Sequence, residues 1–221
     1  MQLNTVIFDM DGLLIDSEPY WAEAADEVFK ELGVSLTPEQ YVTTTGLRTK
    51  EFLQHWFNHF NISTSLLPEA DEKITHFVIE KVKKEAVPLQ GVHYAFNLFQ
   101  SKKFKIGLAT SSPSSLIDVV VQICGIEKYL QAIASAEELA YGKPHPMVYL
   151  TCAEKLESNP QECICFEDSF NGMIAAKAAK MKCVVVPHHS QLKDERFGAA
   201  DLKLSSLQNF SELHFNLMMG K

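Results

Sequence analysis

The chain has 221 residues, 46% of them hydrophobic, which is enough for one domain or for a core with an inserted subdomain. Acidic residues outnumber basic ones by 28 to 20, and no block of lysine and arginine stands out. This composition argues against binding to nucleic acid or to an anionic membrane surface. We find no secretory signal and no apolar run of 18 residues, so we expect a cytoplasmic protein without a membrane segment.

The five cysteines are odd in number and lie in apolar surroundings, which is typical of reduced thiols buried in an intracellular core. Cys163 and Cys165 form a C-x-C pair, but no second pair accompanies them. A zinc or redox site at this pair is therefore not expected.

Short apolar runs rich in β-branched residues predict buried strands. They cover residues 4–8, 104–110, 162–168 and 182–187, and the stretch 130–135 is a weaker candidate. Helical patterns fill most of the gaps, over residues 89–102, 113–124, 146–157 and 170–180. Strands that alternate with helices predict an α/β fold, in which a doubly wound parallel sheet carries helices on both faces.

Residues 17–87 break this alternation because they contain no convincing buried strand. Ser17 is the expected N-cap of a first helix that ends near Gly33. Thr37 is the expected start of a second helix, and a third helix is expected over about 68–86. We therefore predict a helical cap, residues 17–87, inserted into a core that consists of residues 1–16 and 88–221.

Polar side chains directly follow the predicted strands. The residues at these strand ends are Asp9 and Asp11, then Thr110, Ser111 and Ser112, and then Glu167, Asp168 and Ser169. Lys143 lies in the sequence GKPHP, at the entry to the helix predicted over 146–157. Because ligands bind outside the carboxyl ends of strands in an open parallel sheet, we expect all these side chains to meet at one edge.

Clustered carboxylates repel one another and raise each other's pKa unless a cation compensates. Magnesium binds one or two carboxylates and keeps several waters or substrate phosphate oxygens. Asp9 with Asp168 or Glu167 would supply the protein ligands. We therefore expect Mg²⁺ as the cofactor.

A phosphate group is the expected partner of that cation. The Thr110 hydroxyl, the backbone amides around Ser111 and the Lys143 ammonium would bind its oxygens. Carboxylates act as covalent nucleophiles in phosphoryl transfer. A second carboxyl group that carries a proton can protonate the leaving oxygen and then activate the attacking water. The D-x-D spacing of Asp9 and Asp11 would place both groups beside one phosphoryl group. A lone D-x-D could equally be a turn or a helix start, but three further motifs accompany this one.

Four segments, DMDGLLIDSE, LATSS, GKPHP and FEDSFNG, resemble in this order the motifs of the haloacid dehalogenase-like phosphohydrolases. The resemblance spans nearly the whole chain and implies a Rossmann-like core with a helical cap inserted after the first strand. It implies that Asp9 is the nucleophile and a magnesium ligand. Asp11 would be the general acid and base, and its backbone carbonyl would also bind the metal. Thr110 and Lys143 would bind the transferring phosphate.

The same resemblance implies that Asp168 is the second magnesium carboxylate, with Glu167 beside it as a ligand directly or through water. Thr45, Arg48 and Lys50 lie in the cap segment that would close over the site, so they are candidates for substrate selection. Arg48 could clamp a second anionic or hydroxyl-rich group of the substrate.

The sequences DSEPYW and GLR resemble helical-cap sugar-phosphate phosphatases of the 2-deoxyglucose-6-phosphatase kind, close relatives of the β-phosphoglucomutases. In those mutases a cap histidine supports the acid/base aspartate, and Trp21 stands at that position here. We therefore expect a monomeric, magnesium-dependent phosphatase that hydrolyses a small phosphorylated metabolite, a hexose phosphate or related sugar phosphate, through an aspartyl-phosphate. A β-phosphoglucomutase-type mutase and a non-catalytic binding protein with this fold are the alternatives.

Several conspicuous residues have a structural interpretation. Asp16 and Glu18 are assigned to the N-terminus of the first cap helix, where negative charge is favourable, and are left out of the catalytic set. His188 and His189 are expected on a solvated polar loop rather than in a metal site. Three aromatic residues are expected in the helix core rather than in a sugar-stacking platform: Trp21, Trp56 and Phe57.

Overall fold

The computed structural model describes residues 3–220. It contains a six-stranded sheet, all parallel, in the order β3-β2-β1-β4-β5-β6. The strands are β1 (Thr5–Phe8), β2 (Lys105–Thr110), β3 (Ala132–Ser135), β4 (Cys163–Glu167), β5 (Lys182–Val185) and β6 (Leu202–Lys203). The five predicted strands are confirmed, including the weaker one that became β3. Strand β6 was not predicted, because its two residues are too short to show a pattern.

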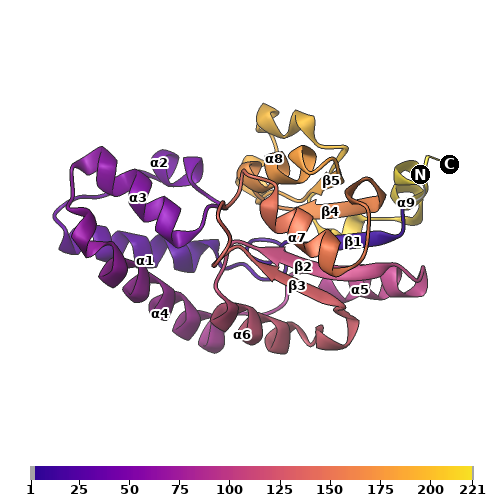
Figure 1. Ribbon diagram of the computed structural model, residues 1–221, viewed down its shortest axis with the longest axis horizontal. Helices are drawn as coiled ribbons and strands as arrows, with labels where there is room; N and C mark the ends of the chain where they lie inside the picture. Colours follow the sequence, from indigo (N-terminus) through magenta and orange to yellow (C-terminus); the bar gives the residue numbers. More distant parts are fainter. Residues whose placement is uncertain (1–2, 221) are drawn as a thin grey trace.

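Helices cover both faces of the sheet (Figure 1). Along β1, Val6 and Phe8 face α5 (Val92–Ser101), α6 (Ser114–Cys124) and α9 (Glu212–Met218). Ile7 faces the opposite way, toward α7 (Met147–Lys155) and α8 (Phe170–Ala178). The predicted doubly wound, Rossmann-like α/β fold is confirmed. The four inner strands β2, β1, β4 and β5 are buried on both sides, which explains their nearly continuous apolar sequences.

A cluster of aromatic rings anchors the centre of the sheet. Phe8 stacks on Phe96 with the ring centroids 4.5 Å apart and on Phe166 at 5.1 Å, and Phe99 meets Phe166 edge-on at 5.6 Å. Each such pair adds about 0.5–1.5 kcal/mol beyond the burial of its surface. The cluster joins β1 and β4 to α5, so it holds the ends of these two strands in register.

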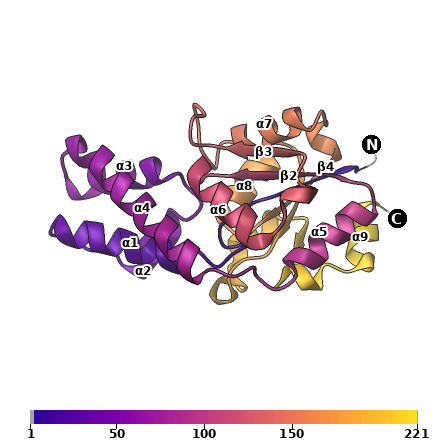
Figure 2. The ribbon, with the colours of Figure 1, turned by 90° about the horizontal axis from the view of Figure 1, so that it is seen from below.

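The remaining helices lie at one end of the molecule, beyond the carboxyl ends of the strands (Figures 1 and 2). They are α1 (Glu18–Glu31), α2 (Pro38–Thr43), α3 (Thr49–Phe60) and α4 (Leu67–Glu85). Thr37 caps α2 as predicted, since its hydroxyl accepts from the Gln40 amide while the Gln40 side chain accepts from the Thr37 amide. Ser17 is the N-cap residue of α1, as predicted, but its hydroxyl makes no bond to the start of the helix and donates to Asp11 instead.

Two chain segments connect this helical region to the sheet, and they run side by side. Ile15 forms isolated bridges with Asp11 and Pro88, and the Leu89 amide donates to the Leu14 carbonyl at 2.8 Å. One hydrophobic cluster continues from the sheet through α6 into α1, α3 and α4. The helical region therefore stands directly over the strand ends that carry the predicted site.

The other expectations concern scattered residues. All five cysteines are buried free thiols, as predicted. Trp56 and Phe57 are buried in the helical core, and His188 and His189 are exposed beside the short 3-10 turn His189–Gln191. Further 3-10 turns span Thr64–Leu66, Glu127–Tyr129, Pro160–Glu162, Glu195–Ala199 and Leu207–Asn209. No helix within residues 3–220 has the length and apolar character needed to cross a membrane.

Candidate active site

A cavity lies where the strand ends meet the helical region. Its floor comes from the loops that follow β1, β2 and β4 and from the loop before α7. Its walls come from α1, α2, α3 and α4 and from the segment between α2 and α3. The predicted residues that line it are Asp9, Asp11, Thr45, Thr110, Ser111, Lys143 and Asp168. Four segments far apart in sequence are thus brought together, because parallel strands present their carboxyl ends at one edge.

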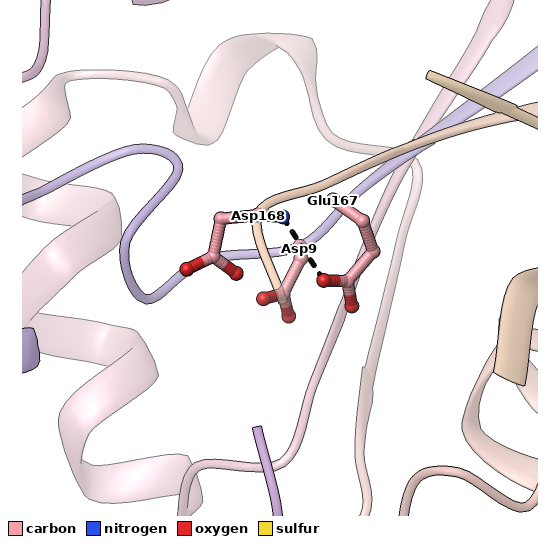
Figure 3. Close-up of side chains that lie close together, drawn as sticks. All are labelled: Asp9, Glu167 and Asp168. Carbon is pink, nitrogen blue, oxygen red and sulfur yellow. Dashed lines mark hydrogen bonds between the residues drawn. The ribbon is translucent and has the colours of Figure 1, made fainter. Parts of the chain in front are cut away.

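Three carboxylates form the acidic part of the floor. Asp9, Glu167 and Asp168 each offer an oxygen, and these oxygens all lie within 4.8 Å of one another (Figure 3). Gly12 makes room for the cluster: its φ is +67°, and a Cβ there would lie 2.0 Å from Asp168 Oδ2. A larger residue at this position would both strain the backbone and displace the carboxylate.

Glu167 is fully buried and surrounded by donors. Its Oε1 accepts from Lys143 Nζ at 2.6 Å and from the Tyr149 hydroxyl. Its Oε2 accepts from the Asp168 amide and from the amide and hydroxyl of Ser169. These bonds leave little of its carboxylate for a metal, so Asp9 and Asp168 are better placed as direct ligands. Glu167 instead holds Lys143, whose Nζ also donates to Asp9 Oδ1 at 2.6 Å.

The ionisation of this cluster follows from burial and from its neighbours. Burial and the Glu167 carboxylate raise the pKa of Asp9 to about 8, against the opposing effect of Lys143. Burial, Glu167 and Asp9 hold the pKa of Asp168 well above its usual range. Burial alone would raise the pKa of Glu167 and lower that of Lys143. The Lys143 ammonium instead lowers the pKa of Glu167, and the carboxylates of Asp9 and Glu167 raise that of Lys143. Three carboxylates face one ammonium, so the donor set fits a hard divalent cation.

Asp11 is held by four side chains. Its Oδ1 accepts from the Ser17 hydroxyl at 2.6 Å and from Trp21 Nε1 at 3.0 Å. Its Oδ2 accepts from the Ser112 hydroxyl at 2.7 Å and from the Thr110 hydroxyl at 3.4 Å. Ser112 was expected at this edge of the sheet, whereas Ser17 was not assigned to the site. Trp21 packs against the hydrophobic core, as expected. Trp21 also lines the cavity, and its place at the position of the mutase histidine was a signal for this second role.

The segment between α2 and α3 touches the loops that follow β2 and β4. The Ser111 hydroxyl donates to the Gly46 carbonyl at 2.8 Å, and Asn171 Nδ2 donates to the Thr45 carbonyl at 2.8 Å. Thr45 therefore lines the cavity as expected of a residue that closes over it. These two hydrogen bonds join the helical region to the loops of the floor.

Arg48 does not line the cavity. Its Nη1 donates to the carbonyls of Ala136 at 3.0 Å and Leu139 at 2.6 Å, and its Nη2 pairs with Glu51. Glu51 in turn accepts from the Gly142 amide at 3.1 Å. The structure thus places Arg48 against the loop that carries Lys143 rather than against a substrate, and Lys50 is exposed to solvent.

Glu18 is a further residue of the cavity that sequence reasoning left out. It lies in the first turn of α1, as expected, but its side chain lines the cavity together with Trp21. Burial and the carboxylates of Asp11 and Asp9 raise its pKa to about 8. Its helix position alone could not show this, because the orientation of α1 over the sheet decides which of its faces meets the site.

Comparison with known proteins agrees with this geometry. Residues 6–186 match the sequence model of the haloacid dehalogenase-like hydrolases. The chain is 41% identical to hexitol phosphatase B of Escherichia coli over 93% of both chains. It is 32% identical to a phosphorylated carbohydrates phosphatase of Thermotoga maritima, over 85% of this chain and 87% of that one.

Solved structures show the same fold. A β-phosphoglucomutase of Clostridium difficile superposes with a TM-score of 0.88, covering 99% of this chain and 97% of that one, at 24% identity. The sequence relatives support the predicted enzyme class, a phosphatase. From the match over most of its length and the shared architecture, the chain belongs to the haloacid dehalogenase-like hydrolases.

Proposed function

We propose that the protein hydrolyses the phosphate monoester of a small sugar phosphate or sugar-alcohol phosphate. The observation that carries this proposal is the floor of the cavity. There the Asp9 carboxylate, paired with Lys143, and the hydrogen-bonded Asp11 face one space. The names of the relatives from Escherichia coli and Thermotoga maritima support the carbohydrate part of the substrate.

We further propose residues 17–87 as a cap on a core made of residues 1–16 and 88–221. The two adjacent connecting segments support this division, because a cap joined at one place can rotate as a unit. The contacts of Ser111 with Gly46 and of Asn171 with Thr45 would then belong to the closed state, which excludes bulk water.

Asp9 and Asp168, with the backbone carbonyl of Asp11, would hold Mg²⁺. The bound cation would neutralise charge on the phosphate oxygens during transfer. Lys143 supplies a positive charge beside Asp9, and Glu167 keeps the ammonium in place. Thr110 and the amides around Ser111 would contribute donors to the phosphate.

In the proposed reaction, an Asp9 oxygen attacks phosphorus and the bond from phosphorus to the ester oxygen breaks. Asp11 gives its proton to the leaving oxygen, and it then takes a proton from the water that cleaves the aspartyl-phosphate. The contacts of Asp11 suit both of its protonation states. The hydroxyls of Thr110 and Ser112 can rotate to donate or accept at Oδ2, whereas Trp21 N–H always holds Oδ1 as an acceptor.

The test is phosphate release from a panel of sugar, sugar-alcohol and nucleoside phosphates, with magnesium and with chelator. We expect turnover of some carbohydrate phosphates, and a loss of activity with chelator. Asp9→Asn should lower kcat by on the order of 10³-fold or more, because the amide cannot act as the nucleophile.

Asp16→Asn is the matched control, since this exposed carboxylate stands on the same segment outside the cavity and should be dispensable. Full activity of Asp9→Asn would exclude the mechanism, and release from no carbohydrate phosphate would exclude the substrate class. Cytoplasmic location and a monomeric state stay predictions.

A further inference from the structure

We propose that Glu18 selects the substrate by accepting a hydrogen bond from a hydroxyl of an uncharged polyol tail. Because the wall around the substrate tail carries no positive charge, the cavity rejects substrates that carry a second anionic group far from the transferred phosphate. This inference rests on the proposed function and names the substrate class more narrowly.

The charges of the cavity wall are the first observation. Besides Glu18, the residues that the helical region contributes to the wall are aromatic, aliphatic or hydroxyl-bearing: Trp21, Ala25, Tyr41, Thr44, Thr45, Gly46, Leu47, Thr49, Phe52 and Ile74. Among the described residues, Lys143 is the only cationic side chain of the lining, and it lies in the floor. The wall around a substrate tail therefore offers hydroxyl groups, apolar surface and one carboxyl group, but no positive charge.

The nearest basic residues do not supply that charge. The Arg48 guanidinium donates to the carbonyls of Ala136 and Leu139 and pairs with Glu51, with its side chain only 14% exposed. Lys50 is exposed and outside the lining. A second phosphate or a carboxylate on the tail would lose its hydration without gaining a cationic partner, which is unfavourable.

The first turn of α1, which carries Glu18, is fixed over the floor of the cavity. Ser17 and Trp21 flank Glu18 and both donate to Asp11, so the start of the helix is tied to the reaction centre. The Glu18 carboxyl group itself forms no hydrogen bond within residues 3–220, although it lines the cavity. In either protonation state its oxygens accept a hydrogen bond from a hydroxyl, and in neither state does it carry the positive charge that would offset an anionic tail. A hydroxylated tail satisfies it in both states, whereas an acidic tail is repelled once Glu18 is ionised.

The inference is tested with two open-chain substrates of equal length. Glucitol 6-phosphate and 6-phosphogluconate differ only at C1, which is a neutral alcohol in the first and a carboxylate in the second. We expect the wild type to favour glucitol 6-phosphate by at least about tenfold in kcat/KM. For the same reason glucose 1,6-bisphosphate should be at least about tenfold poorer than glucose 6-phosphate.

Glu18→Gln should change kcat/KM for the two open-chain substrates in opposite directions. The amide keeps the shape but cannot become an anion, and it always offers an N–H donor to the 6-phosphogluconate carboxylate, whereas Glu18 repels that carboxylate when ionised. We expect kcat/KM to fall for glucitol 6-phosphate and to rise for 6-phosphogluconate, so that their ratio drops by about tenfold or more. A damaged fold cannot produce opposite changes. Asp16→Asn, which removes a nearby exposed carboxylate, should leave the ratio unchanged.

The outcomes separate the two proposals. Equal kcat/KM for both substrates in the wild type, or an equal loss for both in Glu18→Gln, would overturn the role of Glu18 and leave the proposed function in place. If glucose 1,6-bisphosphate is turned over better than glucose 6-phosphate, the role of Glu18 is also overturned and the proposed function stays in place. Release of phosphate from none of these compounds would overturn the proposed function and this inference together.

Discussion

The carboxylates of Asp9 and Asp11 lie in different environments, although the two residues are only two positions apart in the sequence. Asp9 pairs with the Lys143 ammonium and lies among other carboxylates, whereas Asp11 is surrounded by hydroxyls and an indole N–H. An anionic nucleophile needs a positive neighbour, and a group that gains and loses a proton needs partners that tolerate both states. The backbone turn at Gly12 places the two side chains in these separate surroundings.

The variant Ser112→Ala tests whether the hydrogen bonds to Asp11 support its proton transfer. In Ser112→Ala, Oδ2 loses its donor at 2.7 Å and keeps only the longer contact with Thr110 at 3.4 Å. We expect kcat to fall by about 3- to 30-fold with little change in unfolding free energy, because one hydrogen bond is worth about 0.5–1.5 kcal/mol and more when one partner is charged.

The control for this prediction is Ser114→Ala, which removes an exposed hydroxyl two residues further on that contacts Glu137 instead of Asp11. Steady-state kinetics and urea unfolding of both variants make the comparison. Equal kcat values for the two variants would mean that Ser112 does not assist Asp11.

At the scale of elements, helix α3 is joined to the loop that presents Lys143. Arg48 and Glu51 at the start of the helix contact the Ala136 and Leu139 carbonyls and the Gly142 amide. A Cβ on Gly142 would lie 2.3 Å from Glu51 Oε2, so the loop approaches the helix as closely as a glycine permits. A movement of α3 therefore also displaces or releases this loop.

Arg48→Ala separates the two roles considered for this residue. If Arg48 joins α3 to the loop, the variant should lose about 1–3 kcal/mol of unfolding free energy and exchange amide hydrogen faster over residues 136–142. Its order of preference among substrates should stay the same. Lys50→Ala, which removes an exposed neighbouring charge, should change neither property. A changed preference with unchanged exchange would instead support substrate binding by Arg48, as the resemblance implies.

For the whole molecule, the acidic cavity makes stability depend on pH. Asp9 and Glu18 have ordinary pKa values of 3.8 and 4.5, raised to about 8 in the folded chain. Between about pH 4 and 8 the folded chain keeps protons that the unfolded chain has released. The stabilising contribution of both groups is therefore complete below about pH 4 and is lost as the pH rises through about 8.

We expect the Tm of the chelator-treated protein to fall from pH 5 to pH 9, and to fall less steeply in Glu18→Gln. Magnesium should raise Tm more at pH 8 than at pH 5, because it competes with protons for the carboxylates. Thermal unfolding across this pH range, with and without magnesium, measures both effects. Parallel Tm curves for the wild type and Glu18→Gln would contradict the raised pKa of Glu18.

The sequence by itself determined the alternation of five strands with their crossover helices, the parallel sheet and most of the cavity floor. Buried parallel strands must be apolar throughout, so their ends can be read from the sequence, and the residues after them must meet at one edge. Asp9, Asp11, Thr110, Lys143 and Asp168 were found in this way.

The tertiary structure alone decided the upper part of the site. Ser17, Glu18 and Trp21 read equally well as the start of an ordinary helix, and only the placement of α1 over the strand ends turns them toward the cavity. It also decided that Arg48 meets backbone carbonyls far away in sequence. Contacts between distant elements depend on how helices pack, and a local pattern carries no information about that packing.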